Sequence, residues 1–139
     1  MYRDTITLFC RVSSGDNLCW VPYILKNVDF NADKARILSV YGESSQDRAI
    51  LHLSLNNGKC NGLRYVYPKE YMGEATTFTL KSGKDFDFFV LGAYEFGTVN
   101  DDDYKDGFFN YINKTLDNVF MITSAAEYSI IPHIEVTGR

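Results

Sequence analysis

The first thirty residues alternate between apolar and polar side chains, as β-strands with one buried face do. Residues 4–12 place apolar side chains on one face and mainly polar ones on the other. A cluster of turn-forming residues at 13–17 separates this stretch from a second strand-like stretch at 19–27. We therefore predict that the chain begins with a β-hairpin.

The middle of the chain contains further strand-like stretches. Residues 48–55 alternate cleanly, and Asn57-Gly58 after them favours a tight turn because both residues tolerate a left-handed backbone. Residues 62–67 would then be the second strand of this hairpin. The remaining strand-like stretches are residues 76–80 and 85–92.

Two segments favour helical structure. Residues 31–40 predict either a short helix capped by Asn31 or an exposed excursion. The aspartates at 101–103 suit the acidic start of a helix, and apolar side chains recur after them at helical spacing. We therefore predict one amphipathic helix near residues 103–117.

The last two predicted strands carry strong apolar signals. Residues 119–124 are an almost continuous apolar run, which is typical of a strand buried on both faces. Residues 128–137 alternate, with Tyr128, Ile130 and Pro132 among the residues of one face. We predict that these two stretches are the final strands of the fold.

Together the elements predict a mainly β fold: a small β-barrel or sandwich of about seven strands with one helix near 103–117 and, as one alternative, a short helix near 31–40. No internal repeat, low-complexity tract or Pro/Ser-rich linker divides the chain. We therefore predict a single domain over residues 1–139, a length that can bury one hydrophobic core.

Composition narrows the classes of function. The chain has 14 Lys+Arg against 18 Asp+Glu, a formal net charge of −4, and its basic residues are scattered. Proteins that grip nucleic acid by its phosphates need clustered basic residues, so we exclude that role. Aromatic residues make up 15% of the chain, which suits either protein–protein contact or a tyrosine-rich core.

Cysteine usage and hydropathy indicate where the protein is made. Cys10, Cys19 and Cys60 are odd in number and lack the spacing of a disulfide framework or a zinc site. No signal peptide is visible, nor an apolar run of the roughly 20 residues that span a membrane. We expect a cytoplasmic protein without membrane contact, metal or cofactor.

The residues that could carry out catalysis have simpler explanations. His52 and His133 lie in predicted strands, on the faces away from the apolar residues, without a nearby nucleophile. Asp85 and Asp87 would share one strand face about 7 Å apart, which suits a glycosidase but also an ordinary exposed face. The acidic run at 101–103 lacks the spacing of a calcium loop. We predict that the protein is not an enzyme.

Three stretches carry a resemblance to a known family. The opening residues 1–9 (MYRDTITLF), the closing run Asn118–Ser124 with residues 128–138, and the strand-like residues 48–53 are similar to tailed-phage head-completion proteins, the stopper or head–tail joining family. The usual members are shorter, and residues 94–118 have no obvious counterpart in them.

The resemblance implies a structural protein of a phage or prophage neck. It would be a small β-barrel that forms a homo-oligomeric ring between the portal or adaptor and the tail, closing the head after DNA packaging. Genomic double-stranded DNA would pass through without specific binding, and the protein would be part of the virion, assembled in the cytoplasm of the bacterial host. A tail-completion or minor capsid protein is the near alternative. A small cytoplasmic ligand-binding module or hydrolase is the alternative from another class.

Under this interpretation two sets of residues become candidate sites. The first is an acidic loop facing the channel or a neighbouring ring, where a basic lining would hold DNA back, and it consists of Asp101, Asp102 and Asp103. The second is a subunit interface built from aromatic side chains: Tyr65, Tyr67, Tyr71, Tyr94 and Phe96. A place in the hydrophobic core is the alternative for each tyrosine.

Overall fold

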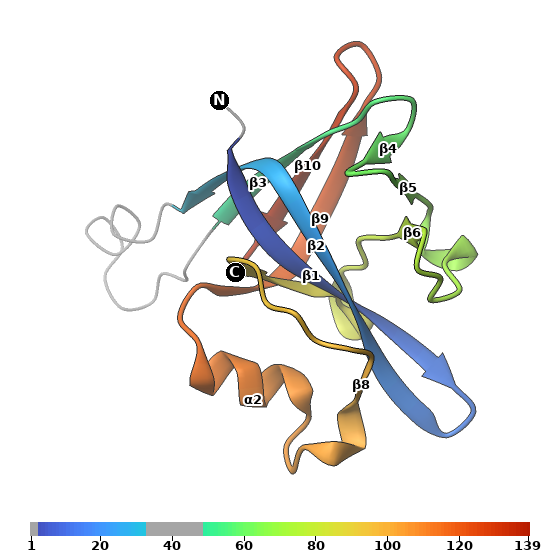
Figure 1. The fold of residues 1–139 in the computed structure, drawn as a ribbon, viewed down its shortest axis with the longest axis vertical. Helices are drawn as coiled ribbons and strands as arrows, with labels where there is room; N and C mark the ends of the chain where they lie inside the picture. The colour runs from blue at the N-terminus through green and yellow to red at the C-terminus, as the bar shows by residue number, and fades with distance from the viewer. Residues whose placement is uncertain (1–2, 33–48) are drawn as a thin grey trace.

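The computed structural model describes residues 3–32 and 49–139, and its central feature is a closed six-stranded β-barrel (Figure 1). Around the barrel the strand order is β1-β7-β9-β10-β3-β2, and β2 pairs again with β1; a further strand, β8, is added to β2. The strands are β1 (Asp4–Ser14), β2 (Asn17–Ala32), β3 (Ala49–Ser54), β7 (Phe88–Leu91), β8 (Val99–Asn100), β9 (Val119–Tyr128) and β10 (His133–Gly138). The predicted mainly β fold is confirmed.

The long strand β2 closes the barrel because it pairs with two strands in succession. Its first part runs antiparallel to β1, and residues 29–32 pair with β3. Asn27, with φ at 57°, is the extra residue of a bulge near this change of partner, since Lys26 and Val28 face consecutive residues of β1. Asparagine tolerates this left-handed conformation, so the strand can bend from one partner to the next.

The first predicted hairpin is confirmed, but its second strand is longer than expected. It continues beyond residue 27 to Ala32, so Asn31 is in a strand and does not begin a helix. The rest of the helix predicted near residues 31–40 lies outside the described residues.

A smaller three-stranded sheet packs against the barrel core through Cys60 and Phe78. Its strands are β4 (Lys59–Cys60), β5 (Leu63–Tyr65) and β6 (Thr77–Phe78). The predicted hairpin between residues 48–55 and 62–67 is wrong: β3 pairs with β2 and β10, whereas β5 pairs with β4 and β6. The reason is that two successive Asn-Gly turns, all four residues of which have positive φ, reverse the chain twice before β5 begins.

Two hydrophobic clusters stabilise the fold. The first fills the barrel with buried side chains that include Leu8, Leu51, Phe89, Ile122 and Val136. The second lies between the barrel wall and the helix α2 (Phe108–Thr115), and its buried members are Phe9, Trp20, Phe88, Val90, Phe108 and Ile112. Both faces of β1 at residues 6–10 and of β7 at residues 88–90 are therefore buried, because one face meets the barrel interior and the other meets the layer that contains the helix.

Helix α2 is shorter than predicted and starts at Phe108, not near residue 103. Gly107 precedes it with φ at 89°, outside the helical region, so a helix cannot run through this residue. The three aspartates form a separate 3₁₀ turn, η4 (Asp101–Asp103). The amphipathic character is confirmed, since Phe108 and Ile112 are buried one turn apart. Among the described residues, no helix has the length and apolar character needed to cross a bilayer.

The C-terminal strands also differ from the prediction. In β9 only Phe120 and Ile122 are buried, so residues 119–124 are not covered on both faces. The outer half of β9 extends beyond the barrel (Figure 1), and the last strand begins at His133, not at residue 128. Ile130 and Ile131 lie in the turn between the strands and are 96% and 75% exposed. These apolar side chains led to the prediction of a strand, but the structure places them in a turn where they face solvent.

Candidate functional site

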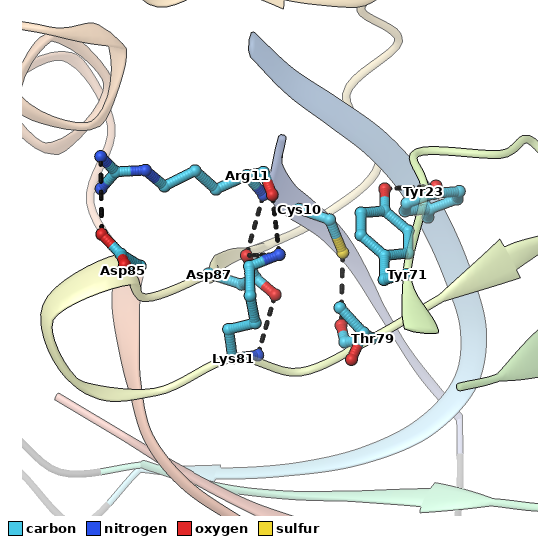
Figure 2. Close-up of polar contacts among 8 residues, drawn as sticks. All are labelled: Cys10, Arg11, Tyr23, Tyr71, Thr79, Lys81, Asp85 and Asp87. Carbon is cyan, nitrogen blue, oxygen red and sulfur yellow. Dashed lines mark hydrogen bonds and ion pairs between the residues drawn. The ribbon is translucent and has the colours of Figure 1, made fainter. Parts of the chain in front are cut away.

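Asp87 is the charged side chain that is fully buried within the described part of the chain. It lies between a 3₁₀ turn, η3 (Gly83–Asp85), and β7. Its Oδ1 accepts the backbone N–H of Arg11 at 2.8 Å, and its Oδ2 accepts the backbone N–H of Lys81 at 2.8 Å (Figure 2). The Lys81 ammonium lies 3.1 Å from Oδ1. The carboxylate is thus enclosed by three donors.

Lys81 completes this ionic cluster. Its Nζ donates to the backbone carbonyl of Arg11 at 2.7 Å and lies 4.8 Å from the centroid of the Tyr71 ring. Strand β7 pairs with β1 only between Ile6 and Phe9. Beyond Phe9, the Asp87 carboxylate accepts the backbone N–H of Arg11 and the Lys81 ammonium donates to the backbone C=O of Arg11. These two side chains therefore bond the backbone of β1 where β7 no longer does.

The protonation of Asp87 reflects competing effects. Burial raises the pKa of its carboxyl to about 6, while the Lys81 charge and the two backbone N–H groups oppose the rise. Desolvation outweighs these contacts because the side chain is completely removed from water. The carboxyl is therefore mainly ionised at pH 7 and titrates just below it.

A thiol and two phenols lie beside the ionic cluster (Figure 2). The Cys10 thiol donates to the Thr79 carbonyl at 3.2 Å, and burial raises the pKa of this thiol well above its usual value. Tyr23 donates to the Glu74 carbonyl at 2.6 Å, so the 2.6 Å bond between the two hydroxyls has Tyr71 as donor. Burial raises the pKa of Tyr23 to about 12 and also raises that of Tyr71. All three groups stay protonated at neutral pH and act as hydrogen-bond donors.

A surface pocket of about 260 Å³ opens beside this cluster. Its lining residues are Arg11, Val12, Ser13, Pro68, Tyr71, Lys81 and Asp85. The two cationic groups already have partners, because Lys81 bonds Asp87 and the Arg11 guanidinium lies 3.8 Å from Asp85. The cluster chiefly fixes the loops before β7 to β1. A ligand in the pocket would have to compete with the Arg11–Asp85 pair.

The interpretation of Asp85 and Asp87 as two carboxylates on one strand face is wrong. Asp85 belongs to η3 and its side chain is 71% exposed, whereas Asp87 is fully buried. The 3₁₀ turn replaces the regular pleat that would have placed them on the same side. One carboxylate faces solvent and the other stabilises the barrel wall.

The three candidate channel aspartates have different environments. Asp101 Oδ1 accepts the indole N–H of Trp20 and the backbone N–H of Phe108, both at 2.9 Å. It therefore satisfies a donor at the start of α2 and ties the helix to β2. Asp102 and Asp103 are exposed. Only these two are available to a channel or a neighbouring ring.

The five candidate interface aromatics lie in three places: two pairs near the surface and Tyr71 in the core. Tyr65 and Tyr67 adjoin each other with ring centroids 5.9 Å apart, and the Tyr67 hydroxyl lies 3.3 Å from Glu127 on β9. Tyr94 and Phe96 lie instead near α2: Tyr94 packs against the second hydrophobic cluster, and the Phe96 ring contacts the ring of Phe108. Tyr67 is 59% and Phe96 is 38% exposed, Tyr65 and Tyr94 are half-buried, and Tyr71 is only 9% exposed. Tyr71 therefore belongs to the core.

The exposed end of the β9–β10 hairpin was not among the expected sites. Its tip carries Ile130 and Ile131, and Tyr128, 46% exposed, stacks on the His133 ring at 4.8 Å. A groove of about 250 Å³ runs beside the same end, lined by Arg64, Tyr65, Val66, Tyr67, Glu70 and Glu127. The sequence signal was the pair of isoleucines directly before Pro132, which suits a turn better than a strand interior.

The two histidines lie on the outer face of the barrel. His52 Nδ1 is 3.5 Å from Asp29 and its Nε2 is 3.4 Å from Glu135, one residue on each neighbouring strand. His133 lies diagonally across, with a ring-centroid distance of 5.9 Å. In residues 3–32 and 49–139, no group of three or more His, Cys, Asp or Glu side chains is arranged to hold a metal ion.

Comparisons of this chain with protein-family models, with curated proteins and with solved structures found no match. The function is therefore inferred from the geometry of the described residues and from the sequence resemblance carried by the two ends of the chain and residues 48–53.

Proposed function

We propose that this protein is a structural component of a tailed-phage or prophage neck, acting through contacts with copies of itself and with neighbouring virion proteins. The observation that carries the proposal is the projecting β9–β10 hairpin, whose tip exposes Ile130 and Ile131. Large apolar side chains gathered at one projecting element favour burial against a partner. The buried carboxylate of Asp87, by contrast, is occupied by its bonds to Arg11 and Lys81, which hold the barrel together.

The terminal sequences supply the link to a phage neck. Residues 4–9 of the opening stretch lie in β1 and the closing residues form β9 and β10, so these resembling stretches are strands of the barrel wall, with β7 between β1 and β9. A ring subunit needs two contact faces, and exposed aromatic or apolar side chains occur near the hairpin and near α2. A tail-completion or minor capsid protein would use the same surfaces.

Charge supports a channel through which DNA slides. The net charge of −4 and the exposed Asp102 and Asp103 would repel phosphates and leave the duplex free to move. In this proposal the duplex is guided and not bound, so no basic groove is required.

The test uses particles produced from the genome that encodes this chain. We expect the chain to be detected by mass spectrometry in purified tailed particles, and its deletion to give heads that lose DNA or lack tails. A deletion complemented with the Ile130→Asp, Ile131→Asp double variant should show the same defect. Complementation with Met72→Asp, which alters an apolar residue in another loop with an exposure close to that of Ile131, should restore particles. Normal infectious particles from the deletion would disprove the proposal.

A ligand-binding module is the second candidate, because the pocket beside Arg11 and Lys81 is open to solvent. Calorimetric titration with small carboxylates and phosphates tests it. Saturable binding that is lost in Arg11→Met but kept in Arg64→Met would favour this class, since Arg64 lies in the other groove.

A further inference from the structure

The outer half of β9 has an open backbone edge. Strand β7 pairs with β9 only from Val119 to Met121, while β10 pairs with β9 as far as Tyr128. Within the described part of the chain, no strand occupies the side of residues 123–128 that β7 leaves. These residues are also exposed, and the side-chain contact that reaches them from outside the hairpin, in the described part of the chain, is that of the Tyr67 hydroxyl with Glu127.

The register shows which backbone groups face this edge. The N–H of Leu55 donates to the carbonyl of Pro132 at 3.0 Å, which makes these two residues a hydrogen-bonded pair between β3 and β10. Hydrogen-bonded pairs recur at every second residue of an antiparallel ladder, so every second residue of β10 after Pro132 also has its backbone groups directed to β3. The residues between them face β9, where their partners are Ser124, Ala126 and Tyr128. The N–H and C=O groups of Ala125 and Glu127 therefore point to the open side.

A second strand edge in the molecule is closed by the chain itself. At Lys26 of β2, the side-chain amide of Asn61 accepts the backbone N–H at 3.0 Å and donates to the backbone carbonyl at 2.9 Å. The amide thus replaces a neighbouring strand at that position. No such cap protects Ala125 and Glu127 among the described residues.

The side chains along the open edge do not obstruct pairing. Ser124, Ala125 and Ala126 are small, and the stretch contains no Lys, Pro or Gly of the kind that blocks exposed edges. The one charged side chain is Glu127, which the Tyr67 hydroxyl holds at 3.3 Å, beside the groove. An extended polypeptide can therefore approach the edge closely.

We propose that this edge pairs antiparallel with the same edge of a second copy of the chain, about a two-fold axis through Ala126. In this register Ala125 of each copy faces Glu127 of the other, so the outward N–H and C=O groups of both residues are bonded in both copies. No two like charges and no two bulky side chains stand directly opposite each other. The same segment thus supplies both halves of a self-complementary contact.

The hairpin tips add apolar contact to the pairing. Past the paired residues, Ile130 and Ile131 of each copy extend along β9 of the other copy, towards the point where that strand leaves β7. A two-fold contact closes on itself, so it goes beyond the proposed ring: it joins two copies before, or separately from, ring assembly.

The first test is the mass of the purified full-length chain, measured by sedimentation and native mass spectrometry. We expect a reversible dimer whose dissociation constant rises at least about tenfold in Ala125→Pro. Proline removes an N–H that faces outward, so no bond to β10 is lost. Ala125→Val keeps this N–H and should keep the dimer. A monomer at all concentrations, or an Ala125→Pro dimer as tight as the parent, would overturn the proposal.

The second test is a disulfide across the axis. The Cα atoms of a non-hydrogen-bonded antiparallel pair lie about 4.5 Å apart, within the range of a disulfide. Ala126→Cys should form cross-linked dimers on mild oxidation, at several times the yield of Ser124→Cys, which lies off the axis. Equal yields, or none above the parent chain, would contradict the two-fold register.

The two proposals can fail separately. Particles that require the chain, together with a monomeric purified protein, would reject the edge pairing and keep the neck function. A dimer that Ala125→Pro abolishes, together with normal particles in its absence, would do the reverse. Binding of the edge to a different protein by a chain that never dimerises would count against a second copy as the partner.

Discussion

Asp87 and Lys81 show how two side chains can substitute for a strand. Where β7 stops pairing with β1, their carboxylate and ammonium bond the backbone of Arg11 from 76 and 70 positions away in the chain. The carboxylate is fully buried and the ammonium side chain is only 17% exposed, so neither group is replaced easily by water. Removing one of them leaves the other buried and unpaired, which costs more than the loss of one hydrogen bond.

We expect Asp87→Ala to lower the free energy of unfolding by about 3 kcal/mol or more, because it leaves Lys81 and two backbone N–H groups without an acceptor. Asp85→Ala is the matched control, since its exposed ion pair with Arg11 should contribute no more than about 1 kcal/mol. Urea denaturation of the three proteins measures the difference. Equal losses for the two variants would show that burial does not distinguish them.

The stability should also depend on pH through Asp87. Because burial raises its folded pKa to about 6, above the ordinary value of 3.8, the folded state binds the proton more tightly than the unfolded chain. The contribution of this group is therefore fully present below pH 3.8 and is lost as the pH rises through 6.

We expect the unfolding free energy of the parent protein, relative to that of Asp87→Asn, to fall by up to about 3 kcal/mol between pH 4 and pH 8. The carboxyl carbon of Asp87 should titrate near pH 6 in an NMR experiment. A midpoint near 4 would mean that the Lys81 charge and the backbone donors outweigh burial.

At the scale of elements, helix α2 depends on a contact from outside itself. Gly107 cannot cap the helix with a side chain, and the first turn receives Asp101 in place of a cap. The same carboxylate oxygen accepts the Trp20 indole N–H, so one residue joins η4, α2 and β2. The acidic run therefore has a structural member and two exposed members.

We expect Asp101→Ala to lower the free energy of unfolding by about 2 kcal/mol, because Trp20 and the Phe108 N–H both lose an acceptor in a partly buried site. Trp20 fluorescence should change as well. Asp103→Ala, an exposed neighbour, is the control and should change stability by less than about 0.5 kcal/mol. If the control is as destabilised as Asp101→Ala, the contact with Trp20 is not the cause.

The whole molecule consists of a barrel and an aromatic layer that share β1 and β7. Phe9 and Phe88 point outward to α2, while Leu8 and Phe89 point inward to the barrel core. Loss of either cluster exposes one face of the same strands. The two clusters should therefore unfold as one cooperative unit.

We expect Trp20 fluorescence, which reports on the aromatic layer, and far-ultraviolet circular dichroism, which reports on the barrel strands, to give coincident denaturation curves. A fluorescence transition at clearly lower denaturant would show instead that α2 detaches before the barrel opens. Ile112→Ala, which weakens the helix contact, should shift both curves together.

Local patterns were sufficient to predict several elements. The β1–β2 hairpin, the amphipathic helix and the mainly β fold follow from spacing within short stretches, because alternation and helical periodicity are local properties of the chain. Turn chemistry was located correctly at Asn57-Gly58, but a second Asn-Gly turn at residues 61–62 redirected the chain away from the predicted partner.

The candidate sites were decided by the tertiary structure. The sequence alone shows a chain that is rich in aromatic residues, mildly acidic and patterned for β-strands. It did not reveal that Asp87 reaches Arg11, that Asp101 reaches Trp20, or that Ile130 remains in solvent. The physical reason is that burial and hydrogen-bond partners depend on which distant segments the barrel brings together, and the type of a residue does not specify those neighbours.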